Sequence, residues 1–161
     1  EALVCCQKDG NYAGITKTHL YLGKLAWSLG DTELATRELA EAFTACQQVN
    51  AQYLTANLLT FQSNLAWTGG DEIQAEIGMK EALKAAGKMK PLEFSGTEAL
   101  DALAQLNVYQ QPERAARLFG AIDHNYWQYS SDLTPVERAR REASMQKTEP
   151  TEPPQTAATS F

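Results

Sequence analysis

Metal ligation and nucleophilic catalysis are the first chemistries to look for in this sequence. Its two histidines, His19 and His124, stand far apart, and Asp123 beside the second adds a single neighbouring carboxylate. A closed zinc site needs more ligands than these. The sequence holds no glycine-rich phosphate loop and no Cys-x-x-Cys motif, and no base stands beside a serine or a cysteine. We therefore expect no enzyme, no metal and no cofactor.

The three cysteines give little support to redox chemistry. Cys5, Cys6 and Cys46 are an odd number, and two of them are adjacent, so they support no disulfide framework. We expect small apolar cysteines on helix faces, in a reducing cytoplasmic compartment. A redox sensor would need cations that stabilise the thiolate, and Lys8 is the nearest in sequence.

The charge balance excludes some partners. Fourteen Lys and Arg against twenty Asp and Glu give a net charge of −6 over 161 residues. Such a chain has no overall attraction for nucleic acid. No apolar run approaches the length of a membrane span. A second candidate surface, the arginines of the C-terminal part, has glutamates at helical spacing that neutralise it. These arginines are Arg114, Arg117, Arg138, Arg140 and Arg141, and the glutamates are Glu113, Glu137 and Glu142.

An internal repeat organises the chain. The string LAWSLGD at 25–31 recurs 40 residues later as LAWTGGD at 65–71. Alanine recurs with the same spacing at Ala35, Ala75 and Ala115. A fixed period of this size is typical of repeat proteins, in which each unit packs only against its neighbours.

Each repeat has the pattern of two helices. In the first unit, Gly30 suits the left-handed position that ends a helix, and Asp31 suits the N-cap of the next. No run alternates apolar and polar residues as a strand would, so we expect an all-α protein. A lone helix pair cannot bury its apolar stripe, and neighbouring pairs must therefore stack. In the first helix this stripe comprises Leu22, Leu25, Ala26 and Leu29.

The repeat also predicts the domain organisation. Residues 1–147 form one helical domain, and the proline- and threonine-rich residues 148–161 form a flexible tail. The N-terminal edge is expected to expose apolar surface that another repeat would cover, or that would mediate self-association. Within the domain we expect a truncated unit at 1–9, full units at 13–47, 53–89 and 95–129, and a capping helix at 134–147.

These residues resemble the tetratricopeptide repeat. The resemblance rests on a Leu-Gly pair, spaced alanines and large residues between them, although the period of 40 exceeds the usual one of about 34. It implies a right-handed α-α superhelix of antiparallel helix pairs. The second unit has Gln62-Ser63 in place of the Leu-Gly pair. The third unit has Ala102-Leu103 there, and Gln110-Gln111 in place of Gly-Asp. The matching residues are Leu22, Gly23, Ala26, Gly30, Asp31, Ala35, Leu39, Ala42 and Phe43.

The last unit narrows the resemblance. Residues 111–121, QPERAARLFGA, followed by TPVERAR at 134–140, look like the terminal repeats of bacterial regulators of the LuxR and MalT type and of related signal-transduction ATPases. The ATPase and helix-turn-helix motifs of such regulators do not occur in these residues. The resemblance implies a cytoplasmic sensor arm that works with other domains of a parent regulator.

In a tetratricopeptide stack the first helices of successive units line a concave groove. Lys17 and Lys24 share a helix face and align with Asn57 and Asn64, which suits a peptide carboxylate or acidic side chain. The two tryptophans would either add apolar contact in the groove or pack between repeats. The full predicted groove comprises Lys17, Leu20, Lys24, Trp27, Asn57, Thr60, Asn64, Trp67 and Asn107, with Thr97, Leu100 and Ala104 at matching positions.

The expected function is therefore interaction rather than catalysis. The leading hypothesis is a non-enzymatic module of a bacterial signalling or transcriptional regulator that binds a protein segment, peptide or small effector in its groove. Binding would bias the packing between this arm and the rest of its parent. The alternative is a scaffold or oligomerisation module without a groove ligand.

Overall fold

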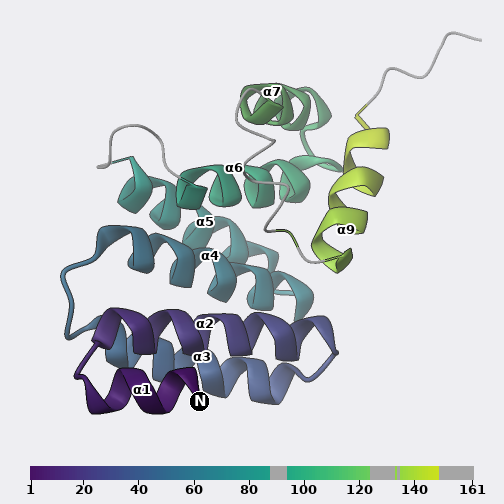
Figure 1. The fold of residues 1–161 in the computed structure, drawn as a ribbon. Coiled ribbons are helices and arrows are strands. Elements are labelled where there is room, and N and C mark those ends of the chain that lie inside the picture. Colours follow the sequence, from purple (N-terminus) through teal and green to yellow (C-terminus); the bar gives the residue numbers. More distant parts are fainter. Residues whose placement is uncertain (88–93, 124–132, 134, 149–161) are drawn as a thin grey trace, which may run out of the picture.

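The computed structural model describes residues 1–87, 94–123, 133 and 135–148, and every regular element in these ranges is an α-helix (Figure 1). The all-α prediction is confirmed. None of these helices is both long and apolar enough to cross a bilayer. The helices are α1 (Ala2–Lys8), α2 (Tyr12–Ser28), α3 (Thr32–Cys46), α4 (Gln52–Thr68), α5 (Glu72–Ala86), α6 (Phe94–Asn107), α7 (Pro112–Asp123) and α9 (Pro135–Gln146).

The helices follow the 40-residue period. The bounds of α4 and α5 lie exactly one period after those of α2 and α3. Helix α2 packs against α3, α4 against α5 and α6 against α7, and the pairs contact one another in chain order. Helix α9 lies beside α6 and runs across the stack (Figure 1). The predicted tail lies outside the described residues from 149 onward.

The Gly-Asp step between paired helices is confirmed. Gly30 has a φ of 84°, which an L side chain rarely adopts, so the glycine ends α2 without strain. Asp31 is the N-cap of α3, and its side chain accepts a hydrogen bond of 2.9 Å from the Leu34 backbone amide. Gly70 and Asp71 repeat this arrangement before α5, with a φ of 87° and a hydrogen bond of 3.0 Å.

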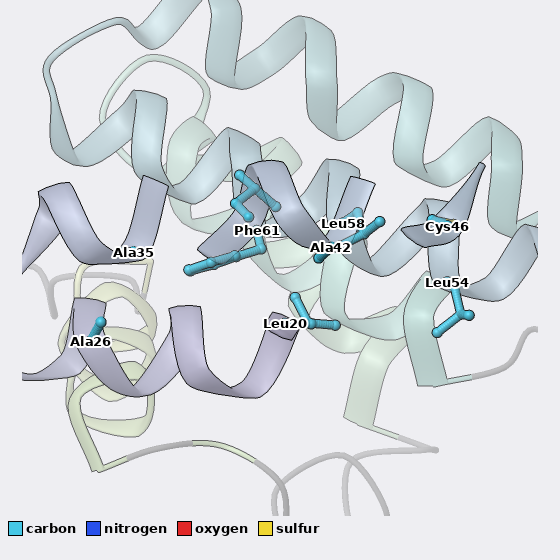
Figure 2. Close-up of a cluster of buried hydrophobic side chains, with 9 residues drawn as sticks. Leu20, Ala26, Ala35, Ala42, Cys46, Leu54, Leu58 and Phe61 are labelled. Atoms are coloured by element: carbon cyan, nitrogen blue, oxygen red, sulfur yellow. The ribbon is translucent and has the colours of Figure 1, made fainter. Parts of the chain in front are cut away.

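The largest core cluster joins the first helix pair to the start of the second. Leu54, Leu58 and Phe61 of α4 are fully buried against α2 and α3 (Figure 2). Each such side chain contributes about 1.5–3 kcal/mol when it leaves water. Ala35 and Ala42 of α3 are also fully buried, and their small size lets the neighbouring helices approach. This interface positions the N-terminal half of the stack.

The predicted apolar stripe of α2 differs from the structure. Leu22, Leu25 and Leu29 are 42%, 55% and 78% exposed, whereas Ala26 is buried. The inward face of α2 instead presents Leu20, Gly23 and Ala26, which pack toward α3 and α4. Helical spacing identifies an apolar face but not which side has a neighbour, and here a largely uncovered edge carries most of the leucines.

Candidate functional site

A guanidinium group lies between two tryptophans on the side of the stack that carries the first helix of each pair. Cζ of Arg140, on α9, lies 5.2 Å from the ring centroid of Trp27 on α2 and 4.7 Å from that of Trp67 on α4. Both distances are within the range of cation–π attraction. Nη2 of Arg140 also donates a hydrogen bond of 3.4 Å to Oδ1 of Asn64. We call Trp27, Asn64 and Trp67 the guanidinium seat.

The repeat builds this seat. Trp27 and Trp67 are one period apart, so the same helical position brings two indoles to the same side of the stack. Trp27 also packs between units, because its ring meets Phe61 edge-on with centroids 6.0 Å apart. Of the two alternatives for the tryptophans, packing between repeats is therefore present in Trp27, and contact with a groove ligand stays a prediction. Asn64 is buried, at 2% exposed, so its amide is held in place by its surroundings.

The neighbouring arginine anchors the same helix to α6. Nε of Arg141 donates a hydrogen bond of 2.6 Å to Oδ1 of Asp101, and Nε2 of Gln105 donates one of 2.6 Å to Oδ2 of that carboxylate. Cζ of Arg141 lies 5.4 Å from the ring centroid of Phe119 on α7. A buried charge of this kind is tolerated because it is both paired and hydrogen-bonded.

The carboxylate seat predicted around Lys24 holds a carboxylate of the chain itself. Nζ of Lys24 on α2 forms an ion pair and hydrogen bond with Oε1 of Glu98 on α6. Their side chains are only 15% and 5% exposed. Lys24 therefore serves a contact between the first and third helix pairs. Lys17 is exposed and its Nζ lies 5.3 Å above the ring centroid of Tyr53.

The remaining predicted groove residues are not all surface groups. Leu20 belongs to the core, and Thr60 is fully buried with its hydroxyl donating to the Ala56 carbonyl at 2.9 Å. Asn107 is buried too, and its Nδ2 donates a hydrogen bond of 2.7 Å to the Leu103 carbonyl. Asn57 is half-buried, and within the described residues its Oδ1 has no hydrogen-bond partner. Trp27, Asn64 and Trp67 of the predicted groove contact Arg140 of α9.

The predicted arginine patch divides into two sets. Arg140 and Arg141 face the stack, whereas Arg117 on α7 and Arg138 on α9 are exposed. Arg114 is exposed and donates to Oδ1 of Asn107 at 3.5 Å. The patch is therefore not one continuous basic surface, and two of its members hold a helix in place.

Outside the guanidinium seat, the described residues offer few groups that could bind a metal or react with a ligand. No cluster of three or more His, Cys, Asp or Glu side chains suited to a metal occurs in the described ranges. The cysteines are free thiols, with Cys5 exposed and Cys46 buried. A pocket of about 530 Å³ opens beside the guanidinium seat, lined by Trp27, Leu65 and Thr36 among others.

The buried polar residues of α6 that face this site were not predicted from the sequence. Glu98, Asp101 and Gln105 of α6 are each at most 4% exposed. One period earlier the same positions hold Leu58, Phe61 and Leu65. A change from apolar to polar residues at a buried position of the repeat was thus a readable sign that basic partners lie opposite.

No protein-family model, curated protein or solved structure matches the chain in comparisons with known proteins. The likeness to tetratricopeptide repeats and to bacterial regulators therefore has its support in the residues of this chain alone.

Proposed function

We propose that the chain is a non-enzymatic helical-repeat module, a right-handed α-α superhelix, that binds a protein segment through an arginine on the guanidinium seat. In this proposal it is the sensor or interaction arm of a bacterial signalling or transcriptional regulator. The placement within a regulator rests on the resemblance of residues 111–121 and 134–140. The binding mode rests on the contacts of α9.

The observation that carries the proposal is the sandwich of Arg140 between Trp27 and Trp67. Two indole faces and an amide oxygen suit a planar cation that donates hydrogen bonds, and guanidinium fits this description better than ammonium. The helix that brings the arginine presents mostly polar side chains to solvent, including Arg138, Glu142 and Gln146. Helix α9 thus lies on the stack much as a bound helical peptide would.

Because α9 already occupies the guanidinium seat, a partner segment can bind there only after α9 leaves it. A tethered helix competes at an effective concentration near the millimolar range. A partner segment must therefore displace α9, and its apparent affinity is its intrinsic affinity multiplied by the fraction of molecules in which the seat is open. This gives the module two states, with α9 docked or released, whose balance a partner shifts.

The test uses this chain's own helix as the probe. A fluorescently labelled peptide of residues 135–148 is titrated against the full chain and against its Arg140→Ala variant, with anisotropy as the readout. We expect tighter binding to the variant, because its own α9 no longer fills the seat. Adding Trp67→Leu to the variant should weaken binding about fivefold, since a cation–π contact between half-buried groups contributes about 1 kcal/mol.

Two matched controls accompany this titration. A peptide with Arg140→Ala should bind the variant chain poorly. Tyr12→Leu in the protein should change nothing, because Tyr12 is an exposed aromatic residue at the other end of α2 from Trp27. Equal affinity of the peptide for chains with and without Trp67 would contradict the proposal.

One observation supports the alternative function, a scaffold or oligomerisation module without a groove ligand. The apolar residues that α2 exposes lie on a different edge of the stack from α9 and have the character of an interaction surface.

A further inference from the structure

Helix α2 carries an exposed apolar edge near one end of the stack. Tyr21 and Leu25, one helical turn apart, are 64% and 55% exposed. Helices α1 and α2 are the purple elements of Figure 1, and Leu20 and Ala26, on the buried face of α2, pack in the core with α3 and α4. Contiguous exposed side chains of this size and character mark a contact surface more often than a solvated face.

The same positions pack against other helices one repeat later. Phe61 stands 40 residues after Tyr21 and is 0% exposed, and Leu65, in the place of Leu25, packs against the core. Because α2 and α4 begin and end one period apart, these are equivalent places on equivalent helices. Residue type does not explain the difference in burial. Helix α4 has a complete helix pair before it, and α2 has only α1.

The interface that covers Phe61 shows which kinds of residue can pack against the edge formed by Tyr21 and Leu25. A Cβ built on Gly23 would lie 2.9 Å from Cε1 of Phe61, so the ring rests against a residue that has no side chain. Trp27 meets the same ring edge-on, with an angle of 68° between the planes. A helix pair thus covers the aromatic residue of the next unit with a small residue and the edge of an indole.

Helix α1 forms the beginning of the same interface. Sγ of Cys6 lies 2.5 Å from where a Cβ on Gly14 would stand. One period later, Cys46 and Leu54 occupy these two positions and belong to one core cluster. Helix α1 therefore has the register of the last residues of α3, and it covers the first turns of α2. Its coverage ends before Tyr21.

A second copy of this chain does not offer the complementary face. Ala115 and Phe119 of α7 stand two periods after Ala35 and Leu39. Both are buried, and Met145 of α9 packs against the cluster that contains them. Met145 and Arg141 of α9 thus occupy part of the surface of the last helix pair, where the α2 edge of another copy would have to pack.

We propose that the edge formed by Tyr21 and Leu25 binds a further helix pair of this repeat type. That pair presents glycine or alanine opposite Tyr21, as α2 presents Gly23 to Phe61. This contact reproduces the one between the first pair and Phe61. It is independent of the guanidinium seat and of what α9 does.

An extended chain tests the proposal. A copy of residues 11–40 is placed directly before Glu1, with its two tyrosines changed to phenylalanine. Since Glu1 stands one period before Glu41, this junction keeps the repeat in register and leaves residues 1–161 unchanged. The readout is nitration of each tyrosine by tetranitromethane, followed by mass spectrometry. We expect Tyr21 to react at least about tenfold more slowly than in the original chain, because reaction then requires local opening.

Two controls fix the interpretation. Tyr12 is 44% exposed, and its counterpart one period later, Gln52, is exposed as well, so its nitration should not change. The variant Gly23→Leu in the added copy should restore the reaction of Tyr21. Unchanged nitration of Tyr21 overturns the proposal, whether the added residues fold elsewhere or stay unfolded. Protection of Tyr21 in the original chain that grows with protein concentration also overturns it, in favour of a second copy.

Discussion

Arg141 and Asp101 form a buried ion pair between α9 and α6. Their nearest atoms, Nε and Oδ1, are 2.6 Å apart, and the two side chains are 3% and 2% exposed. Removal of two charges from water costs several kcal/mol per ion, and the pair compensates only while both members are present. The pair therefore makes the docking of α9 sensitive to any change of either residue.

The first prediction concerns the loss of one member of this pair. Asp101→Ala leaves Arg141 without its carboxylate, and we expect the free energy of unfolding to fall by about 3–5 kcal/mol. Urea denaturation followed by circular dichroism measures the change. The double variant Asp101→Leu, Arg141→Met should recover most of the loss, because neither charge is then buried.

A surface pair provides the control. Nζ of Lys80 lies 2.8 Å from Oε1 of Glu76, and these side chains are 56% and 41% exposed. Lys80→Ala should therefore lower the free energy of unfolding by less than about 1 kcal/mol. If Asp101→Ala is no more damaging than Lys80→Ala, the buried pair does not hold α9 in solution as it does in the structure.

The second prediction compares two glycines inside helices. In Gly23→Ala the new methyl group would lie 2.9 Å from Cε1 of Phe61 and 3.3 Å from the Ala35 carbonyl oxygen. We expect a loss of about 1–3 kcal/mol in unfolding free energy, as for other overpacked sites. Gly120→Ala in α7 meets nothing within 4 Å. That change should stabilise the protein by about 0.5–1 kcal/mol, since alanine loses less backbone entropy. Thermal unfolding of both variants checks the opposite signs.

The third prediction concerns pH. A hydrogen bond from Lys80 holds the pKa of Glu76 below its usual value. Burial opposes this effect, and the charges of Lys80 and Arg114 add smaller contributions that lower the pKa. A lowered pKa in the folded state stabilises it at pH values above the carboxyl's unfolded pKa. This contribution is lost as the pH falls through the folded pKa. Lys80→Ala should therefore raise the pKa of Glu76 and weaken the acid-side loss of stability.

Carbon-detected NMR of the Glu76 carboxyl measures that pKa directly. Lys84→Ala, on the same helix, is the matched control, because Lys84 makes no contribution to the shift. Without Lys80, burial raises the pKa of Glu76 by more than the charge of Arg114 lowers it, so this pKa should return at least to its usual value. A titration of Glu76 that is the same with and without Lys80 would show that the hydrogen bond is absent in solution.

The fourth prediction separates a stacked arginine from a simple cation. Arg140→Lys keeps the charge but loses the planar group that lies between Trp27 and Trp67. We expect α9 to open about fivefold more often, a change of about 1 kcal/mol, because lysine does not replace arginine at stacked sites. Amide hydrogen exchange of residues 140–146 reports this opening. Arg117→Lys, at an exposed position of α7, should leave exchange unchanged.

Much of the helical architecture could be read from the repeat. The Gly30-Asp31 step predicted where α2 ends and α3 begins, because a left-handed glycine and an N-capping aspartate act within a few residues of chain. The groove was harder to predict. Lys24 has the same sequence character whether its carboxylate comes from a ligand or from Glu98, which lies 74 positions away.

The sequence by itself determined the helix pairs, their period and their boundaries, since these depend on local backbone preferences and on apolar spacing. Only the tertiary structure decided that Leu25 is exposed while Leu65 packs against the core, and that Arg140 lies between two tryptophans. Burial and ion pairing depend on which helices become neighbours in space. A period of 40 residues repeats the same helix at each step, but it does not say which unit lacks a neighbour or where a helix outside the period will dock.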